Sequence, residues 1–159
     1  MRHVFKGLLI VLLALPAILV GLFVLYEVMG MAVNHTASAY QTKNAIKLLN
    51  TELSSVEIID SYTETGNTSG TGNHVDMLTA IIFKTDASLP EIEGLIDQNY
   101  GLNEWYCWVE ELEKVVAFWE KDPNFHPYVS EMEVPDDLRH TYLLYINNSA
   151  PFVGNIEGH

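Results

Sequence analysis

The chain has 159 residues, of which 21 are Asp or Glu and 8 are Lys or Arg, and its formal net charge is −13. Such an acidic chain is not expected to bind nucleic acid, because nucleic-acid binding needs basic patches that neutralise phosphates. A single cysteine, Cys107, cannot form a disulfide within the chain, so we expect a hydrophobic core to stabilise the fold.

The first element is an uncharged run of twenty residues, from Gly7 to Tyr26, that contains fourteen Leu, Ile, Val or Phe residues. Twenty apolar residues in a helix match the roughly 30 Å hydrocarbon core of a bilayer. At about −0.3 to −0.6 kcal/mol each, these side chains favour insertion by roughly 4 to 8 kcal/mol. We therefore predict a transmembrane helix over residues 7–26 that contacts the lipid bilayer.

The charges around this run predict its orientation. Arg2 and Lys6 precede it, and Glu27 is the only charged residue between the run and Lys43. By the positive-inside rule, the N-terminus is cytoplasmic and the bulk of the chain lies on the far side of the membrane. This predicts a single-pass protein of the cell membrane, with an extracytoplasmic C-terminal domain.

A cleavable signal peptide is the alternative to a retained anchor. Ala37-Ser38-Ala39 is a small-x-small triplet of the kind that signal peptidase recognises, which would place cleavage after residue 39. The apolar core of a signal peptide usually has about 7–15 residues, and this run is longer. The triplet also lies well beyond the end of the run. We therefore favour a retained signal-anchor helix.

These features divide the chain into a basic N-terminus, an anchor, a juxtamembrane linker and one domain, at residues 1–6, 7–26, 27–35 and 36–159. Residues 34–159 contain six Lys or Arg and twenty Asp or Glu, since Arg2, Lys6 and Glu27 are the only charged residues before them. Their number is typical of one domain with its own core. The acidity keeps a domain soluble, and it is also compatible with a basic partner or a divalent cation.

The domain is predicted to begin with an amphipathic helix over residues 36–53. Its apolar positions at helical spacing are Ala39, Ile46, Leu49 and Leu53. This helix either continues from the membrane helix or is separated from it by a break near Gly30 or Asn34. Residues 56–64 follow, and they are rich in the β-branched and aromatic residues typical of a strand.

Residues 65–74, TGNTSGTGNH, contain only Gly, Thr, Ser and Asn until His74. The spacing of Gly66, Gly70 and Gly72 matches neither a P-loop nor a dinucleotide-binding fingerprint. We predict a long hairpin loop instead. Loops of this kind often carry binding surfaces, so this one is a candidate contact site for a protein or small-ligand partner.

Two later segments, residues 75–85 and 140–147, have apolar residues on both faces of a period-two pattern. Strands of this kind are covered on both sides, so we place both in the middle of a sheet. Between them, Ser88 and Glu91 form a capping box and Pro90 suits a first helical turn. With Gly101 as the C-terminal cap, these signals predict a helix over residues 89–100.

Residues 103–121 fit two secondary structures. Five apolar residues recur at helical spacing: Trp105, Trp108, Leu112, Val115 and Trp119. The five-residue runs WYCWV and VVAFW, at residues 105–109 and 115–119, are also typical of strands. We favour a short strand over residues 105–109 followed by a helix to Lys121. The aromatic segment 105–119 is then either core packing or the wall of an apolar ligand groove, and thus a second candidate partner site.

The remaining segments have little periodicity. Residues 122–138 contain Pro123, Pro127 and Pro135 among five acidic residues, which predicts an irregular acidic connection. The last segment, residues 148–159, has turn residues without an apolar repeat. We expect no regular element there.

No constellation predicts catalysis or ligand chemistry with any specificity. His74 and Asp76 place two metal-ligand types together, and His126, His140 and His159 are the histidines available to join them. No pair has the i, i+4 histidine spacing, and the GxSxG and SxxK serine motifs are absent. We therefore assign no catalytic, cofactor-binding or metal residues and no cofactor. The neighbours of Cys107 predict a buried and inert thiol.

Three sequons, at Asn34, Asn67 and Asn147, lie on the predicted outer side and would be glycan acceptors only in a eukaryotic secretory pathway. The expected fold class is α+β: one transmembrane helix, then a two-layer domain with an antiparallel sheet of three to five strands and the helices over 36–53 and 89–100 on one face. The expected function is a membrane-anchored binding or interaction module, of an accessory or sensor type, rather than an enzyme. The alternatives are an envelope hydrolase or metal-dependent enzyme that uses His74 and Asp76, and a purely structural membrane-associated protein.

Overall fold

The computed structural model describes residues 2–70, 72–121 and 131–159, with the backbone alone for residues 2–11 and Glu120. Its sheet has four antiparallel strands in the order β1-β2-β4-β3. The strands are β1 (Glu57–Gly66), β2 (Asp76–Lys84), β3 (Cys107–Glu111) and β4 (Thr141–Ser149). The predicted α+β class is confirmed, and so is the central position of the two strands with apolar residues on both faces, β2 and β4.

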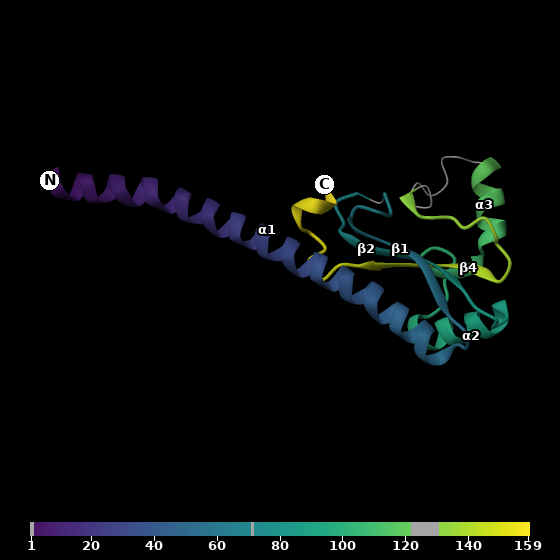
Figure 1. The fold of residues 1–159 in the computed structure, drawn as a ribbon. Coiled ribbons are helices and arrows are strands. Elements are labelled where there is room, and N and C mark those ends of the chain that lie inside the picture. Colours follow the sequence, from purple (N-terminus) through teal and green to yellow (C-terminus); the bar gives the residue numbers. More distant parts are fainter. Residues whose placement is uncertain (1, 71, 122–130) are drawn as a thin grey trace.

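Helix α1 (Arg2–Glu52) is a single helix of 51 residues, roughly 75 Å long. It has no break at Gly30 or Asn34, so the predicted juxtamembrane linker over 27–35 is helical. Figure 1 shows that its N-terminal half projects away from the domain while its C-terminal half lies along the sheet. It is the one helix of the described chain that is long and apolar enough to cross a membrane.

The C-terminal half of α1 packs on the C-terminal tail and on the sheet through one stripe, which starts earlier than predicted. Its buried residues recur every three or four positions: Glu27, Gly30, Asn34, Ser38, Thr42, Ala45 and Leu49. The first five are small or polar, and the last two belong to the apolar core. Ala39, which was expected on the buried face, is exposed because this stripe is rotated away from it.

Helix α1 shares its face of the sheet with α2 (Leu89–Tyr100), as predicted. Side chains from both helices meet Ile81 and Phe83 of β2 and Leu144 and Ile146 of β4. The predicted bounds of α2 are confirmed as well. Its Glu91 carboxylate accepts a hydrogen bond from the Ser88 backbone N–H at 2.8 Å, which lowers the pKa of Glu91.

The opposite face of the sheet is covered in part by α3 (Leu112–Lys121), so the domain has a short third layer beyond the two expected. Leu112 and Val115 of this helix pack on Leu78 and Ile82 of β2 and on Leu143 of β4. The strand-then-helix interpretation of residues 103–121 is therefore confirmed. Of the predicted irregular connection, residues 122–130 lie outside the described part, and residues 131–138 are irregular.

Strand β3 begins two residues later than predicted because Asn103 forms a turn. Its side-chain oxygen accepts the Trp105 N–H at 2.9 Å, and its backbone pairs with Cys107. Trp105 and Tyr106 therefore lie in a turn at the sheet edge. Both are exposed.

The expectation of no regular element in residues 148–159 is wrong, because β4 extends to Ser149 and a short 3-10 helix, η2 (Ile156–Gly158), lies near the end of the chain. The tail, residues 150–159, packs against α1 although its sequence has no periodicity. Asn34 donates to the Phe152 carbonyl at 3.1 Å and accepts the Phe152 N–H at 2.9 Å. Two turns closer to the N-terminus, the Glu27 carboxylate accepts hydrogen bonds from the Asn155 side chain at 2.7 Å and the Ile156 N–H at 2.8 Å. We call this tail and its contacts with Glu27, Gly30 and Asn34 the C-terminal clasp.

Gly30 is required by the clasp, and this gives a first prediction. A Cβ at Gly30 would lie 2.6 Å from Asn155 Nδ2 and 3.3 Å from Phe152 Cδ1, whereas a Cβ at Gly21 would meet nothing within 4 Å. Gly30→Ala should push Asn155 away from Glu27 and lower the free energy of unfolding by about 1–3 kcal/mol, the cost of a buried polar group that loses its partner.

The matched control is Gly21→Ala in the same helix, for which we expect a change within about 0.5 kcal/mol. Urea unfolding of the full chain in nanodiscs, followed by tryptophan fluorescence, measures both values. Equal stability of the two variants would show that the clasp contributes nothing to the folded domain.

Candidate functional site

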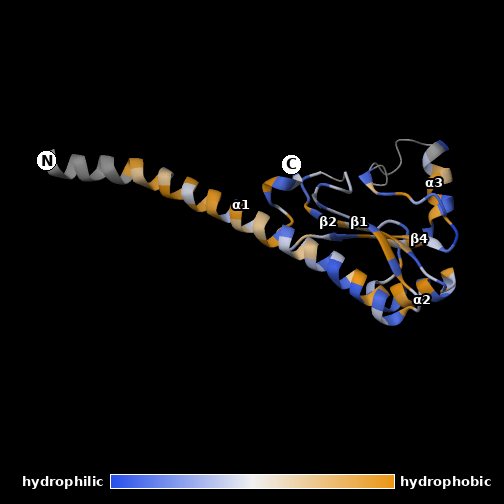
Figure 2. Cartoon of the chain, in the orientation of Figure 1, coloured by the Kyte–Doolittle hydropathy of each residue, from blue (hydrophilic) through white to orange (hydrophobic). Residues whose placement is uncertain are grey.

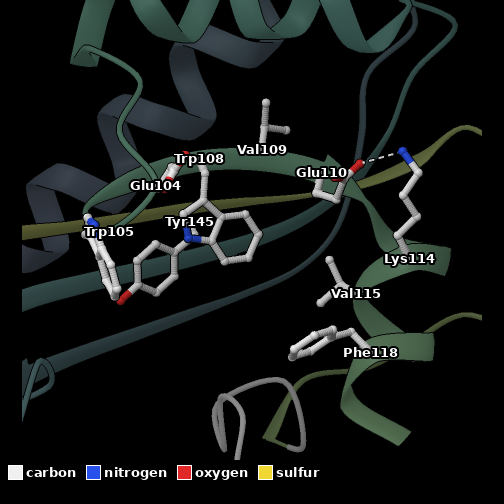
Figure 3. Close-up of a pocket in the computed structure, with 9 residues that line it drawn as sticks. All are labelled: Glu104, Trp105, Trp108, Val109, Glu110, Lys114, Val115, Phe118 and Tyr145. Carbon is white, nitrogen blue, oxygen red and sulfur yellow. Dashed lines mark hydrogen bonds and ion pairs between the residues drawn. The ribbon is translucent and has the colours of Figure 1, made fainter. Parts of the chain in front are cut away.

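The apolar cavity of the domain lies beside β3 and α3, and Figure 3 shows its lining. Its volume is about 460 Å³. We call it the aromatic groove; it is lined by Glu104, Trp105, Trp108, Val109, Glu110, Lys114, Val115, Phe118 and Tyr145. The volume is in the range of pockets that hold small ligands or single large side chains.

The groove has an aromatic floor built by strand pairing. Trp108 of β3 lies opposite Tyr145 of β4 in the ladder, and their rings stack with centroids 5.1 Å apart at an angle of 15°. Side chains alternate along a strand, so Trp108 faces this side while its neighbour Cys107 faces the other core. Cross-strand aromatic pairs of this kind hold each other in place.

The two walls come from the elements on either side of β3. On one side, α3 follows β3 directly, and Val115 and Phe118 lie three residues apart on the same helical face. On the other side, the turn at Asn103 presents Trp105, which is 76% exposed. Phe118 is 49% exposed. Two large aromatic side chains therefore remain accessible at the mouth of an apolar cavity.

Charges at the groove are mostly negative. Lys114 Nζ lies 3.0 Å from Glu110 Oε1 and 3.1 Å from Glu111 Oε2, and these hydrogen bonds raise the pKa of the Lys114 ammonium. One lysine thus faces two carboxylates, and Glu104 adds a third at the mouth. The aromatic surface is bordered by excess negative charge, in keeping with the acidity of the whole domain.

The tryptophans divide between the groove and the core. Trp105 and Trp108 line the groove, while Trp119 packs against the cluster formed by α3 and the sheet. The sequence had left core packing and a ligand groove as alternatives for the segment 105–119. Both occur, because the strand and the helix of this segment turn its aromatic residues in different directions.

The His74 and Asp76 pair does come together, but not in a catalytic geometry. His74 Nε2 lies 3.3 Å from Asp76 Oδ1 and 3.0 Å from Ser149 Oγ. A Ser-His-Asp triad needs the acid on one ring nitrogen and the serine on the other. Here both partners meet the same nitrogen. Asp76 Oδ2 also accepts from the N–H and hydroxyl of Ser69, at 3.1 and 2.6 Å, so the cluster connects the hairpin loop to the strand ends.

None of the histidines whose side chains are described completes a metal site with His74 and Asp76. His140 precedes β4 at the opposite end of that strand from Ser149, and His159 Nδ1 lies 2.9 Å from Asn73 Oδ1. His126 lies outside the described residues. Across residues 2–70, 72–121 and 131–159, no group of three His, Cys, Asp or Glu side chains converges.

The described residues of the predicted hairpin loop border a hollow of mixed polar and apolar character, which Tyr106 and the end of β4 also line. Gly70 and Gly72 adopt φ of 67° and 76°, the left-handed region that favours glycine. Thr68 donates to the Asn147 side chain at 3.1 Å. The hollow beside this loop, about 660 Å³, is larger than the aromatic groove, but its lining is about as polar as it is apolar, whereas the lining of the aromatic groove is mostly apolar.

Burial separates the three sequons. Asn34 and Asn147 are buried, and the side chain of each makes a hydrogen bond, to Phe152 and to Thr68 respectively. A carboxamide in this state has no room for a glycan in the folded domain. Asn67, in the hairpin loop, is exposed.

Known proteins provide no analogy for this geometry: no family model, characterised protein or solved structure matches the chain.

Cys107 gives the second prediction. It is 3% exposed, and burial, with a smaller effect from Asp97, raises the pKa of its thiol to about 11. The thiolate is the reactive form, so the folded protein should react with a disulfide reagent at pH 7.5 at least a hundredfold more slowly than the unfolded chain does.

Absorbance of the released thiolate, with and without denaturant, measures this ratio. A native rate close to that of the unfolded chain would contradict both the burial and the raised pKa of Cys107. An exposed single-cysteine variant of the same chain provides the positive control for the reagent.

Proposed function

We propose that this chain is a single-pass membrane protein whose acidic extracytoplasmic domain is a binding module, and that the aromatic groove is its binding surface. The observation that carries the proposal is the pair of exposed aromatic side chains, Trp105 and Phe118, at the mouth of an apolar cavity. Trp in particular is enriched among residues that contribute most to binding free energy.

The membrane anchor is supported by the surface of α1. The N-terminal part of α1 extends away from the domain and is mostly hydrophobic (Figure 2), and the large apolar side chains from Leu12 to Leu25 are exposed. A helix that is apolar on all sides, with no protein around it, is typical of a lipid-embedded span. Arg2 and Lys6 before the span favour a cytoplasmic N-terminus, and hence a domain outside the cytoplasm.

The chemistry of the groove selects the kind of partner. Its floor and walls are aromatic, and the charge around its mouth is an excess of carboxylates over the single Lys114. The complementary ligand is a protein segment with an apolar side chain flanked by Lys or Arg. The apolar side chain fills the cavity, and the basic groups meet the carboxylates or lie over the Trp105 ring.

The two alternative functions have less support. A hydrolase at His74 and Asp76 lacks a triad geometry, because Ser149 and Asp76 meet the same imidazole nitrogen. A purely structural role gives no reason for a concave apolar surface with exposed aromatic residues at its mouth. An accessory or sensor role fits this surface best, since a tethered module acts by what it captures.

A labelled peptide with two leucines between lysines provides the third prediction. It should bind the full chain held in phosphatidylcholine nanodiscs, as measured by fluorescence anisotropy. Trp105→Ala and Phe118→Ala should each weaken binding roughly tenfold to thirtyfold, because each removes an aromatic wall of the cavity. A peptide with glutamates in place of the lysines should bind at least tenfold more weakly.

Tyr40→Ala is the matched control, since Tyr40 is an exposed aromatic residue on α1, away from the groove. It should leave binding unchanged, and empty nanodiscs should not bind the peptide. If the Trp105 and Phe118 variants bind as tightly as the unmodified chain, the groove is not the binding surface.

A further inference from the structure

The apolar surface of α1 continues past the predicted span. From Gly7 to Val33 the only charged residue is Glu27, and 27 residues of helix are roughly 40 Å long. This exceeds the roughly 30 Å hydrocarbon core by about the thickness of one headgroup layer. Residues 27–33 therefore lie at the depth of the outer headgroups when residues 7–26 span the core.

The side chains of residues 27–33 divide between an exposed face and a covered face of α1. Four of them are exposed and apolar: Val28, Met29, Met31 and Val33. The remaining face, with Glu27 and Gly30, is covered by the C-terminal clasp. The single charge of the segment is thus enclosed, because Asn155 and the Ile156 N–H bind its carboxylate.

The clasp presents apolar side chains at the same level. Ile156 follows the Glu27 contact directly and is 54% exposed, and Val153 is 41% exposed. Phe152 packs against the Tyr26 ring with centroids 5.6 Å apart. Figure 1 shows this tail lying beside α1 where the helix leaves the domain. Val153 and Ile156 are thus exposed apolar side chains in a tail that contacts α1 between Tyr26 and Asn34.

We infer that the C-terminal clasp is a lipid-binding surface: Val153 and Ile156 insert at the boundary between headgroups and acyl chains, beside Val28 and Met31 of α1. This inference rests on the proposed membrane anchor, but not on the proposed binding groove. The occupant is the bilayer itself, because this surface continues the one that α1 exposes to lipid.

The charge of the clasp selects the kind of lipid contact. Its ionisable groups are Glu157, His159 and the enclosed Glu27, with His35 of α1 paired to Glu157. It contains no Lys or Arg, so the contact does not depend on anionic headgroups. Apolar insertion into the interface, as in an interfacial amphipathic segment, is the remaining source of binding free energy.

Spin labels at three positions of the full chain in phosphatidylcholine vesicles test this inference. The variants are Val20→Cys in the span, Ile156→Cys in the clasp and Gln98→Cys on the exposed surface of α2. Because Cys107 is buried, each variant carries one reactive thiol. Collision with oxygen reports lipid contact, and collision with a water-soluble nickel complex reports contact with water.

Ile156→Cys should collide preferentially with oxygen, at a shallower depth than Val20→Cys, while Gln98→Cys should collide preferentially with nickel. If the Ile156 label behaves like the Gln98 label while the Val20 label is deep, the clasp inference is overturned and the anchor stands. If the Val20 label is also exposed to nickel, the proposed anchor itself is wrong.

A second variant tests the contact that holds the clasp. Asn155→Ala, combined with the Ile156 label, should shift the label toward nickel and increase its mobility, because the tail loses its bond to Glu27. If the depth of the Ile156 label does not change, the hydrogen bond between Asn155 and Glu27 does not hold the clasp in the membrane. Adding anionic lipid should leave the depth of the Ile156→Cys label unchanged in the chain that keeps Asn155. If that label enters the bilayer only when anionic lipid is present, the contact is electrostatic and not apolar.

Discussion

The fold depends on one helix that meets two different environments without a break. The N-terminal half of α1 is apolar on its described sides, whereas the C-terminal half has a single buried stripe that covers the sheet. Glu27 lies at the boundary between the half of α1 that is apolar on all described sides and the half that has one buried stripe. Its carboxylate is acceptable there only because Asn155 and the Ile156 N–H pair with it, since a buried and unpaired charge is strongly unfavourable.

The continuity of α1 has a mechanical consequence. A flexible linker would let the domain rotate freely above the membrane. Here the same helix passes from the proposed anchor to the core, and the C-terminal clasp contacts it at Glu27 and Asn34. The orientation of the domain relative to the helix is therefore determined by packing and hydrogen bonds rather than by the length of a tether.

Most of the domain could be predicted from local patterns, because its signals were local. The capping box at Ser88 and Glu91 needs only four residues of sequence, and the two-sided apolar pattern of β2 and β4 needs only the strand itself. The contact stripe of α1 was missed in part for the opposite reason. Its first members are Gly, Asn, Ser and Thr, which carry no apolar signal, and their partners are more than a hundred residues away in the case of Asn34.

The candidate groove was predictable in its composition but not in its geometry. The aromatic residues of segment 105–119 were evident, yet their directions follow from the Asn103 turn and from the change from strand to helix at Leu112. The clasp gave no signal at all, since polar pairs such as Asn155 and Glu27 have no periodicity. The sequence brings His74 and Asp76 close because they are two residues apart at the start of a strand, but it does not show that Ser149 contacts the same imidazole nitrogen.

The arrangement of layers keeps the two proposed surfaces apart. Helices α1 and α2 occupy one face of the sheet, and the groove opens on the other face, over Trp108 and Tyr145. A partner in the groove therefore contacts neither the anchor helix nor the clasp. In the proposed membrane-anchored module, the helix and the clasp would hold the groove at one height and orientation above the membrane, which would lower the orientational entropy that binding costs. In the proposed module, the anchor would raise the effective concentration of the groove for partners at the same membrane. The anchor helix would cover none of the groove.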